Sequence, residues 1–240
     1  MALPLQNTPT YNMVVPSTKQ KIRFRPFLIK EEKSLLIAQQ SEDMLVMVDT
    51  LKNVIRGCVL DKIDVDKLAT FDIEYMFTQI RARSVGENVD ILVQCDDDHG
   101  DQNEKARVKI IIDLSTIQVV TPEGHTNKIE LFDDVGMVMR YPTVEVLNRL
   151  ENTNTDDIEA VFDIVADSVD MIYQGDEIFH AAETPHEEIL QFLNNLTSEQ
   201  FAKVQQFFST MPKITKDIEY KCPICGKEHK KTLEGMESFF

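Results

Sequence analysis

The sequence predicts an α+β fold, because helical and strand periodicities occupy separate stretches of the chain. Apolar residues recur every three or four positions in residues 51–80 and 158–208, whereas they alternate with polar residues in residues 21–25. The pattern contains no strand–helix–strand alternation and no internal repeat, which excludes a doubly wound sheet and a solenoid. With 42% hydrophobic and 28% charged residues, the 240-residue chain has the composition of a globular protein.

The first predicted element is an N-terminal β-hairpin. Residues 11–15 are apolar and β-branched, and residues 16–19 form a proline-containing turn. After the turn, apolar Ile22 and Phe24 alternate with the basic residues Lys21, Arg23 and Arg25. We therefore expect one buried face and one cationic face.

A helical region is predicted next. One helix covers residues 30–39, and a second begins after Ser41, whose side chain is a favourable N-cap. Leu51, Ile55 and Cys58 share one face of this second helix, so Cys58 is interpreted as a buried core thiol. Thr70 is the expected cap of a third helix, which ends before Gly86.

The central segment is predicted to be antiparallel β structure. Residues 89–95 and 106–114 form two strands that an acidic polar turn connects, and short strands are expected at residues 117–120 and near 128–132. From Val135 onward the pattern favours helix again.

The second helical region is predicted from its amphipathic stripe and its caps. Pro142 precedes a helix that extends to about residue 150, and a second helix extends from residue 158 to the glycine at position 175. Capping boxes at residues 184–187 and 197–200 begin two more helices. A proline at position 212 ends the last of them, and strands at residues 213–220 and 231–233 then form a hairpin.

We expect these segments to form one continuous structural unit with three parts. Residues 1–134 hold the N-terminal hairpin, helices and central β segment, residues 135–212 the helical region, and residues 213–240 the Cys-x-x-Cys hairpin and tail.

The net charge of −16 limits the partners of the protein. A chain this acidic repels phosphate backbones, so we expect no nucleic-acid binding. The basic stretches at residues 19–33 and 213–231 are interpreted as solvated strand faces, and an acidic body with basic ends suits docking between unlike protein surfaces. Residues 1–15 lack the apolar run of a signal peptide, and no run of ~20 apolar residues predicts a membrane span. Four scattered cysteines indicate a reducing compartment.

The most specific motif is Cys222-Pro223-Ile224-Cys225-Gly226. Two thiolates at this spacing on a tight turn can bind one metal ion, and the glycine lets the backbone fold around it. We expect a structural zinc ion here. Such a knuckle stabilises a small fold and does not by itself imply catalysis.

A complete zinc site needs two further ligands. Cys95 at a strand end and His99 in the acidic turn would give a Cys3His site, whereas His229 is an alternative ligand close to Cys225. Two other interpretations remain open: a redox-active cysteine pair, for which the strand-to-helix context is missing, and a knuckle that has lost its metal.

Several catalytic signatures fail specific tests in this sequence. His186-Glu187 begins like the helical zinc-protease motif, but Leu190 stands where the second histidine is required. The chain contains no phosphate-binding glycine loop and no Gly-x-Ser-x-Gly elbow. We therefore predict a protein that is not an enzyme.

Several segments together resemble a known family. They are residues 7–11 (Asn-Thr-Pro-Thr-Tyr), the turn 16–18, residues 25–33, 70–72 and 84–87, and the C-terminal residues 232–235 and 238–240. In combination they resemble the base plate protein family of T-even-type contractile-tailed phages, in particular its hub or hub-assembly subunit in cyanophages. The resemblance covers residues 8–240.

The resemblance implies a role in building the baseplate hub through contacts with other tail and hub proteins. The expected location is the host cytoplasm during assembly, or the virion tail if the protein stays in the particle. The family pattern also implies a second Cys-x-x-Cys in the central hairpin. This chain has Cys95 followed by Asp98 and His99 there, and His99 could substitute for the second cysteine.

Two alternative functions follow from the same features. A zinc-ribbon-type regulator would bind nucleic acid through the lysine-rich C-terminal hairpin, against which the charge of −16 argues. A metal-dependent hydrolase would need a metal with an open coordination position and a general base.

Overall fold

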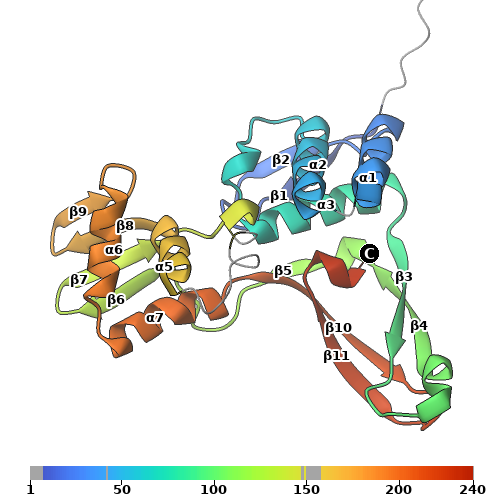
Figure 1. Ribbon diagram of the computed structural model, residues 1–240. Coiled ribbons are helices and arrows are strands. Elements are labelled where there is room, and N and C mark those ends of the chain that lie inside the picture. Colours follow the sequence, from blue (N-terminus) through green and yellow to red (C-terminus); the bar gives the residue numbers. More distant parts are fainter. Residues whose placement is uncertain (1–7, 42, 147–148, 150–157, 240) are drawn as a thin grey trace, which may run out of the picture. The chain divides into compact units, whose positions relative to one another are not determined.

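The computed structural model describes residues 8–41, 43–146, 149 and 158–239, and it confirms the α+β fold class. Contacts within the chain divide it into two compact units, Met1–Val120 with Lys213–Phe240, and Thr121–Pro212. Figure 1 labels the α-helices and strands of both. No helix among the described residues is long and apolar enough to cross a bilayer.

The first unit contains an N-terminal hairpin, three helices and two further hairpins. Its strands are β1 (Tyr11–Val14), β2 (Lys21–Phe24), β3 (Asn88–Gln94), β4 (Arg107–Asp113), β5 (Gln118–Val120), β10 (Lys213–Lys221) and β11 (Glu228–Glu234). Its helices are α1 (Ile29–Ser41), α2 (Met44–Cys58) and α3 (Thr70–Ser84), with 3-10 helices η1 (Val65–Lys67), η2 (Gly100–Ala106), η3 (Leu114–Thr116) and η4 (Met236–Phe239).

The N-terminal hairpin is confirmed. β1 and β2 pair with Met13 opposite Ile22, and both side chains are buried. One cation differs from the prediction: Arg25 is half-buried, because its guanidinium pairs with the buried Glu31 carboxylate at 2.8 Å and donates to the Gly57 carbonyl. The cationic face is therefore shorter than the sequence pattern indicated.

The helices α1, α2 and α3 are confirmed, but two of the predicted N-caps are wrong. Asp43, not Ser41, caps α2 by accepting hydrogen bonds from Leu45 N and Val46 N, and Ser41 is the last residue of α1. The N-cap position of α3 is Ala69 rather than Thr70. The buried Asp72 carboxylate, in the first turn of α3, accepts a hydrogen bond from the backbone N–H of Ala69.

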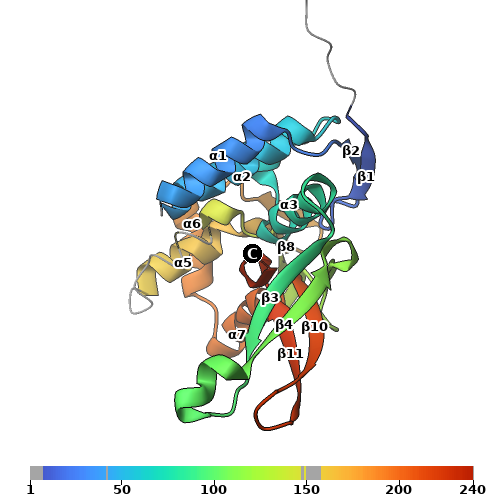
Figure 2. The same cartoon turned by 90° about the vertical axis from the view of Figure 1, so that its right-hand side faces the viewer.

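The central β segment is confirmed as a hairpin, and in the structure it faces the C-terminal hairpin. β3 pairs with β4, and β10 pairs with both β11 and β5. Figures 1 and 2 show the β3–β4 and β10–β11 hairpins extending in the same direction, with their tips together. Buried residues from both hairpins and α3 form one cluster: Ala82, Val93, Ile112, Leu114, Ile117, Ile214, Ile218, Tyr220 and Leu233. The C-terminal hairpin therefore shares a core with the central strands.

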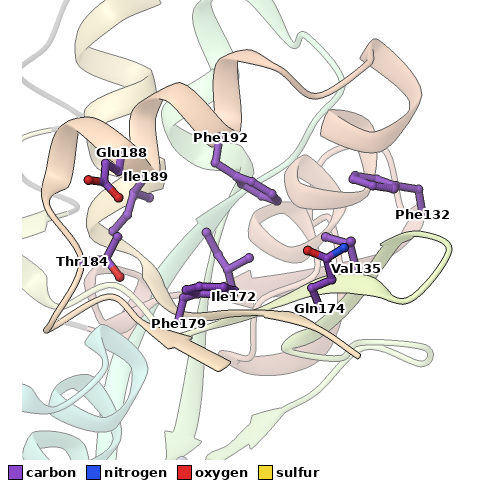
Figure 3. A pocket seen from close by; sticks show the side chains of 9 residues that line it. All are labelled: Phe132, Val135, Ile172, Gln174, Phe179, Thr184, Glu188, Ile189 and Phe192. Carbon is purple, nitrogen blue, oxygen red and sulfur yellow. The ribbon is translucent and has the colours of Figure 1, made fainter. Parts of the chain in front are cut away.

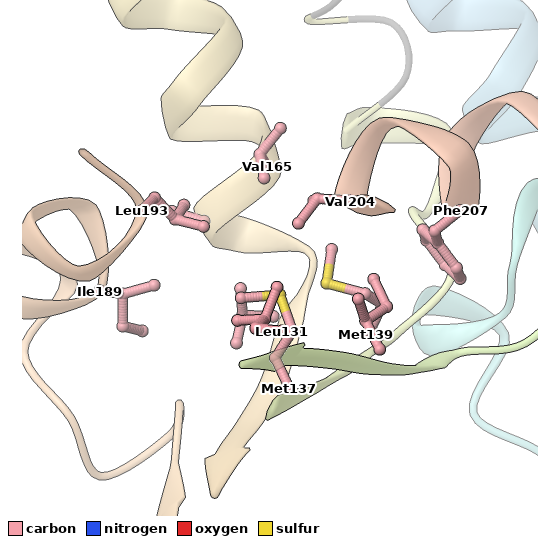
Figure 4. Close-up of a cluster of buried hydrophobic side chains, with 11 residues drawn as sticks. Leu131, Met137, Met139, Val165, Ile189, Leu193, Val204 and Phe207 are labelled. Carbon is pink, nitrogen blue, oxygen red and sulfur yellow. The ribbon is translucent and has the colours of Figure 1, made fainter. Parts of the chain in front are cut away.

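The second unit is a four-stranded antiparallel sheet covered by helices. Its elements are β6 (Lys128–Phe132), β7 (Val135–Met139), α5 (Ile158–Asp167), β8 (Val169–Gln174), β9 (Glu177–His180), α6 (His186–Asn194) and α7 (Ser198–Ser209). The strand order is β6-β7-β8-β9. Figure 4 shows side chains of α5, α6 and α7 meeting those of Leu131, Met137 and Met139 in the core of this unit.

Two segments of this unit were predicted as helix and are strands. Residues from Val135 form β7, and the stripe that was assigned to one helix up to Gly175 divides into α5 and β8 at Ser168. The spacing of Val169 and Ile172 fits a helix as well as a strand. This segment is a strand because its backbone pairs with β7. Gly175 lies in the β8–β9 turn with a φ of 56° rather than at a helix end.

The predicted N-terminal cap is confirmed for α7 and is wrong for α6. Thr197 and Gln200 form the predicted capping box at α7. At α6 the N-cap position is Pro185, and Thr184 donates its hydroxyl to the His180 carbonyl instead. The predicted helix end at residue 150 and the linker at residues 152–157 lie outside the described residues.

Candidate metal centre

The C-terminal knuckle is a tight turn between β10 and β11. Cys222 donates its N–H to the Lys227 carbonyl at 2.9 Å, and Gly226 donates to the Cys222 carbonyl at 3.0 Å. Gly226 has a φ of 71°, a conformation that residues with a Cβ rarely adopt. The Ile224 N–H points at Cys222 Sγ at 3.4 Å. This turn presents the sulfur atoms of Cys222 and Cys225 on one side.

The opposing tip, between β3 and β4, places Cys95 and His99. Cys95 follows the last residue of β3 and donates its N–H to the Ala106 carbonyl at 3.3 Å. His99 N donates to Asn103 Oδ1 at 2.7 Å, and the Asn103 amide donates to Asp98 Oδ1 at 2.8 Å. These polar contacts fix the loop that carries the imidazole.

The four predicted ligands come together. One ligand atom each from Cys95, His99, Cys222 and Cys225 lies within 4.8 Å of the others. Cys95 Sγ and Cys225 Sγ are 3.9 Å apart, and Cys222 Sγ and His99 Nε2 are 3.5 Å apart. A tetrahedral zinc ion with its usual bond lengths has S–S edges of about 3.8 Å and S–N edges of about 3.6 Å. The donor atoms thus have zinc-like spacing.

His229 lies at the same cluster but has other partners. Its Nε2 is 3.2 Å from Cys95 Sγ, and Asp96 lies 3.7 Å from its Nδ1. The imidazole stacks on Tyr220, its cross-strand neighbour, with ring centroids 5.1 Å apart. A second set of ligand atoms, from Cys95, Asp97, Cys225 and His229, also fits within 4.8 Å. Three thiolates and an imidazole suit zinc better than this mixed set.

The cluster lies partly inside the protein. Cys95 and Cys222 are buried with Ala106, whereas Cys225 is exposed. Burial raises the pKa of the Cys222 thiol, but the N–H groups of Cys225 and Ile224, together with the sulfur atoms of Cys225 and Cys95, outweigh it and lower that pKa to about 6. Burial and the neighbouring sulfur atoms raise the pKa of Cys95 to about 11. Of these two thiols, Cys222 therefore loses its proton at the lower pH.

Two charged residues flank the cluster, and the sequence pattern is that of a solvated acidic turn for one and a basic strand end for the other. The Lys227 ammonium pairs with Asp97 Oδ2 at 2.7 Å, and that oxygen is 3.8 Å from Cys225 Sγ. Lys227 holds the pKa of the Asp97 carboxyl below its usual value. Each belongs to an acidic or basic run in the sequence, so no sequence signal distinguishes them. Together they form a neutral ion pair beside a site that three thiolates would make negative, with the Lys227 ammonium supplying its positive charge.

The remaining candidate residues lie elsewhere. Cys58 is fully buried in the core, and burial raises its pKa to about 11, as expected for a core thiol. His186 Nε2 is 3.1 Å from Asp163 Oδ1 and has no second histidine at helical spacing. His125 donates to or accepts from Thr210 and Tyr141 through its two ring nitrogens. None of them joins the cysteine cluster.

Four protein ligands would occupy all four coordination positions of a tetrahedral zinc ion. A catalytic zinc ion keeps one position for water or substrate. The hairpin context also differs from that of a redox pair, because Cys222 and Cys225 join two strands and no helix begins at them. Four ligands that closed around one ion would leave no position for water, as in structural zinc sites.

Comparison with known proteins gives one match. A family model described as T4 bacteriophage base plate protein matches residues 8–240. No curated protein and no solved structure matches the chain.

Proposed function

Because the chain belongs to the T4 bacteriophage base plate protein family, we propose that it is a non-enzymatic structural or assembly protein of the baseplate hub. It acts through contacts with other tail proteins, in the host cytoplasm during assembly and in the virion tail if it remains there. The observation that carries the proposal is the family match across residues 8–240.

The proposal includes a structural zinc ion at Cys95, His99, Cys222 and Cys225. The zinc-like spacing of the donor atoms supports it. Cys95 and Cys222 are 127 positions apart, so the metal would cross-link the tips of two hairpins that are remote in sequence. Such a link restricts the unfolded chain and holds the C-terminal hairpin on the central strands.

A nucleic-acid-binding zinc ribbon fits the charges less well. Of the six lysines in residues 213–231, three pair with carboxylates: Lys213 with Glu234, Lys227 with Asp97, and Lys230 with Glu219. Paired lysines release few counterions from a phosphate backbone.

Genetic complementation tests the assembly role. In a phage that lacks this gene, we expect few finished tails, and the wild-type gene supplied in trans should restore them. Tail proteins should co-purify with the protein from lysates of infected cells. Normal tails in the deletion phage, together with no tail protein co-purifying, would exclude the role.

A second measurement separates a building block from an assembly factor. Mass spectrometry measures the amount of this chain, relative to other tail proteins, in purified virions and in infected-cell lysates. Retention in mature virions identifies a hub component, whereas its presence in lysates alone identifies an assembly factor.

A further inference from the structure

The second unit has an apolar groove between helix α6 and the sheet. Figure 3 shows its lining: Phe132, Val135, Ile172, Gln174, Phe179, Thr184, Glu188, Ile189 and Phe192. The cavity has a volume of about 300 Å³. Two of its aromatic walls are open to solvent, since Phe132 is 41% and Phe179 46% exposed. Large exposed apolar side chains that line one groove are typical of binding surfaces.

Four carboxylates lie in two turns that adjoin the lining residues Phe132, Val135 and Gln174. The β6–β7 turn carries Asp133 and Asp134, and the β8–β9 turn carries Asp176 and Glu177. A hydrogen bond of 3.0 Å from Gly175 N to the Asp134 carbonyl holds the two turns together. All four acidic residues are exposed, and none forms an ion pair with another residue that the structure describes.

A fifth carboxylate, Glu188, lies on the wall of the groove itself. It belongs to the first turn of α6, is exposed, and forms no ion pair within the described part of the chain. The carboxylates therefore lie next to apolar surface without cations to neutralise them.

The charge of the whole unit has the same sign. Residues 121–212 contain eighteen acidic and four basic residues, so −14 of the net charge of −16 lies in this unit. The rest of the chain contains twenty-three acidic and twenty-one basic residues and has a net charge of only −2. A long-range negative field therefore surrounds the groove and attracts cationic partners.

We propose that this groove binds a segment of another baseplate protein in which apolar side chains alternate with lysine or arginine. The apolar side chains fill the space between α6 and the sheet, and the cations pair with Glu188 and the carboxylates of the two turns. The assignment of the partner to the baseplate rests on the proposed function, whereas the chemistry of the segment rests on the groove alone.

Charge decides between this occupant and others. A symmetric pairing of two copies through this groove would bring two units of charge −14 together, which is unfavourable. An acidic segment meets the same repulsion. A purely basic segment would leave Phe132 and Phe179 exposed.

Fluorescence anisotropy of the full chain with labelled peptides tests the proposal. The probe is a short peptide in which leucine and phenylalanine alternate with lysine. One comparison peptide has glutamate in place of lysine, and another has serine in place of the apolar residues. We expect the first to bind, the other two to bind at least ~10-fold more weakly, and its affinity to fall as salt is raised.

Matched variants locate the binding. Phe179→Ala and Glu188→Lys should each weaken the first peptide by ~10-fold or more. The controls are Ile178→Ala, the neighbouring exposed apolar residue of β9, which does not line the groove, and Glu123→Lys, a charge reversal in another turn of the same unit. Both controls should bind the peptide as the wild type does.

Several outcomes would overturn the inference. They are no binding of the first peptide, equal binding of the serine or glutamate peptide, equal losses in the control variants, or a dimer in sedimentation that Phe179→Ala dissociates. The peptide-binding assay uses the purified protein and no phage. A negative result there would contradict the groove proposal even if tail assembly still requires the protein. The reverse result, binding without a tail defect, would contradict only the proposed function.

Discussion

Cys95 and Cys225 are 130 positions apart in the sequence, yet their sulfur atoms lie 3.9 Å from each other at the joined tips of two hairpins. Next to these tips, the Tyr220 hydroxyl of β10 donates a hydrogen bond of 3.0 Å to the Gln94 carbonyl of β3 and so connects the two hairpins. The shared core and this polar contact bring the hairpins together, and the sulfur cluster lies at their free end.

Cys222→Ser should remove the metal and destabilise the first unit. Loss of a structural metal costs at least ~4 kcal/mol, which corresponds to a fall in Tm of roughly 8–16 °C for a chain of this size. Zinc content by mass spectrometry and thermal unfolding followed by circular dichroism measure the two effects. Cys58→Ala is the control and should retain zinc. A Cys222→Ser protein with unchanged zinc and Tm would exclude the metal link.

His99→Ala should weaken metal binding more than His229→Ala does. We expect a loss in zinc affinity of more than ~100-fold when the fourth ligand is removed, and of ~10-fold when a neighbouring group is removed. Cobalt(II) titration reports the ligands through its absorption spectrum, which should change in His99→Ala and remain tetrahedral in His229→Ala. The opposite order would identify His229 as the ligand.

Gly136→Ala should destabilise the second unit by about 3 kcal/mol. A Cβ at this position would lie 2.2 Å from the Tyr173 hydroxyl and 2.6 Å from the Ile129 carbonyl oxygen, and the backbone atom cannot move away. Urea unfolding measures the loss, and a value below ~1 kcal/mol would contradict this packing.

Tyr173→Phe is the companion variant with the opposite expectation. The Tyr173 hydroxyl is buried and has no hydrogen-bond partner among the described residues. Removing an unsatisfied buried hydroxyl should leave stability unchanged or raise it by up to ~1 kcal/mol in the same assay. A clear destabilisation would reveal a partner for this oxygen.

His125 should make stability depend on pH. Burial lowers its pKa below the usual value, so the unfolded chain takes up a proton more readily than the folded protein. This contribution to stability is present above about pH 6.5 and is lost as the pH falls through the lowered pKa. Urea unfolding between pH 7.5 and pH 5.5 should therefore show a smaller fall for His125→Gln than for the wild type. Equal falls would contradict the prediction.

Local sequence signals predicted many elements with accuracy. The N-terminal hairpin, helices α1, α2 and α3, and the Thr197–Gln200 capping box all depend on residues close in sequence. The motif around Cys222 and Cys225 also forms a turn whose hydrogen bonds lie within six residues. Such features need no knowledge of distant neighbours.

The errors share a different cause. Residues of β7 and β8 are apolar at spacings that fit either a helix or a strand, and pairing between Gly136 and Tyr173 decides the outcome. At α2, Asp43 and Ser41 are both good N-caps, and the choice depends on where α1 ends.

By itself, the sequence determined the α+β class and the acidic character, and it named the candidate sulfur and imidazole donors. Only the tertiary structure brought Cys95 and His99 to Cys222 and Cys225, and it alone placed the apolar groove beside the acidic turns. The physical reason is that a donor set and a groove are relations between distant segments. The packing of whole hairpins and helices decides these relations, and residue spacing along the chain does not encode them.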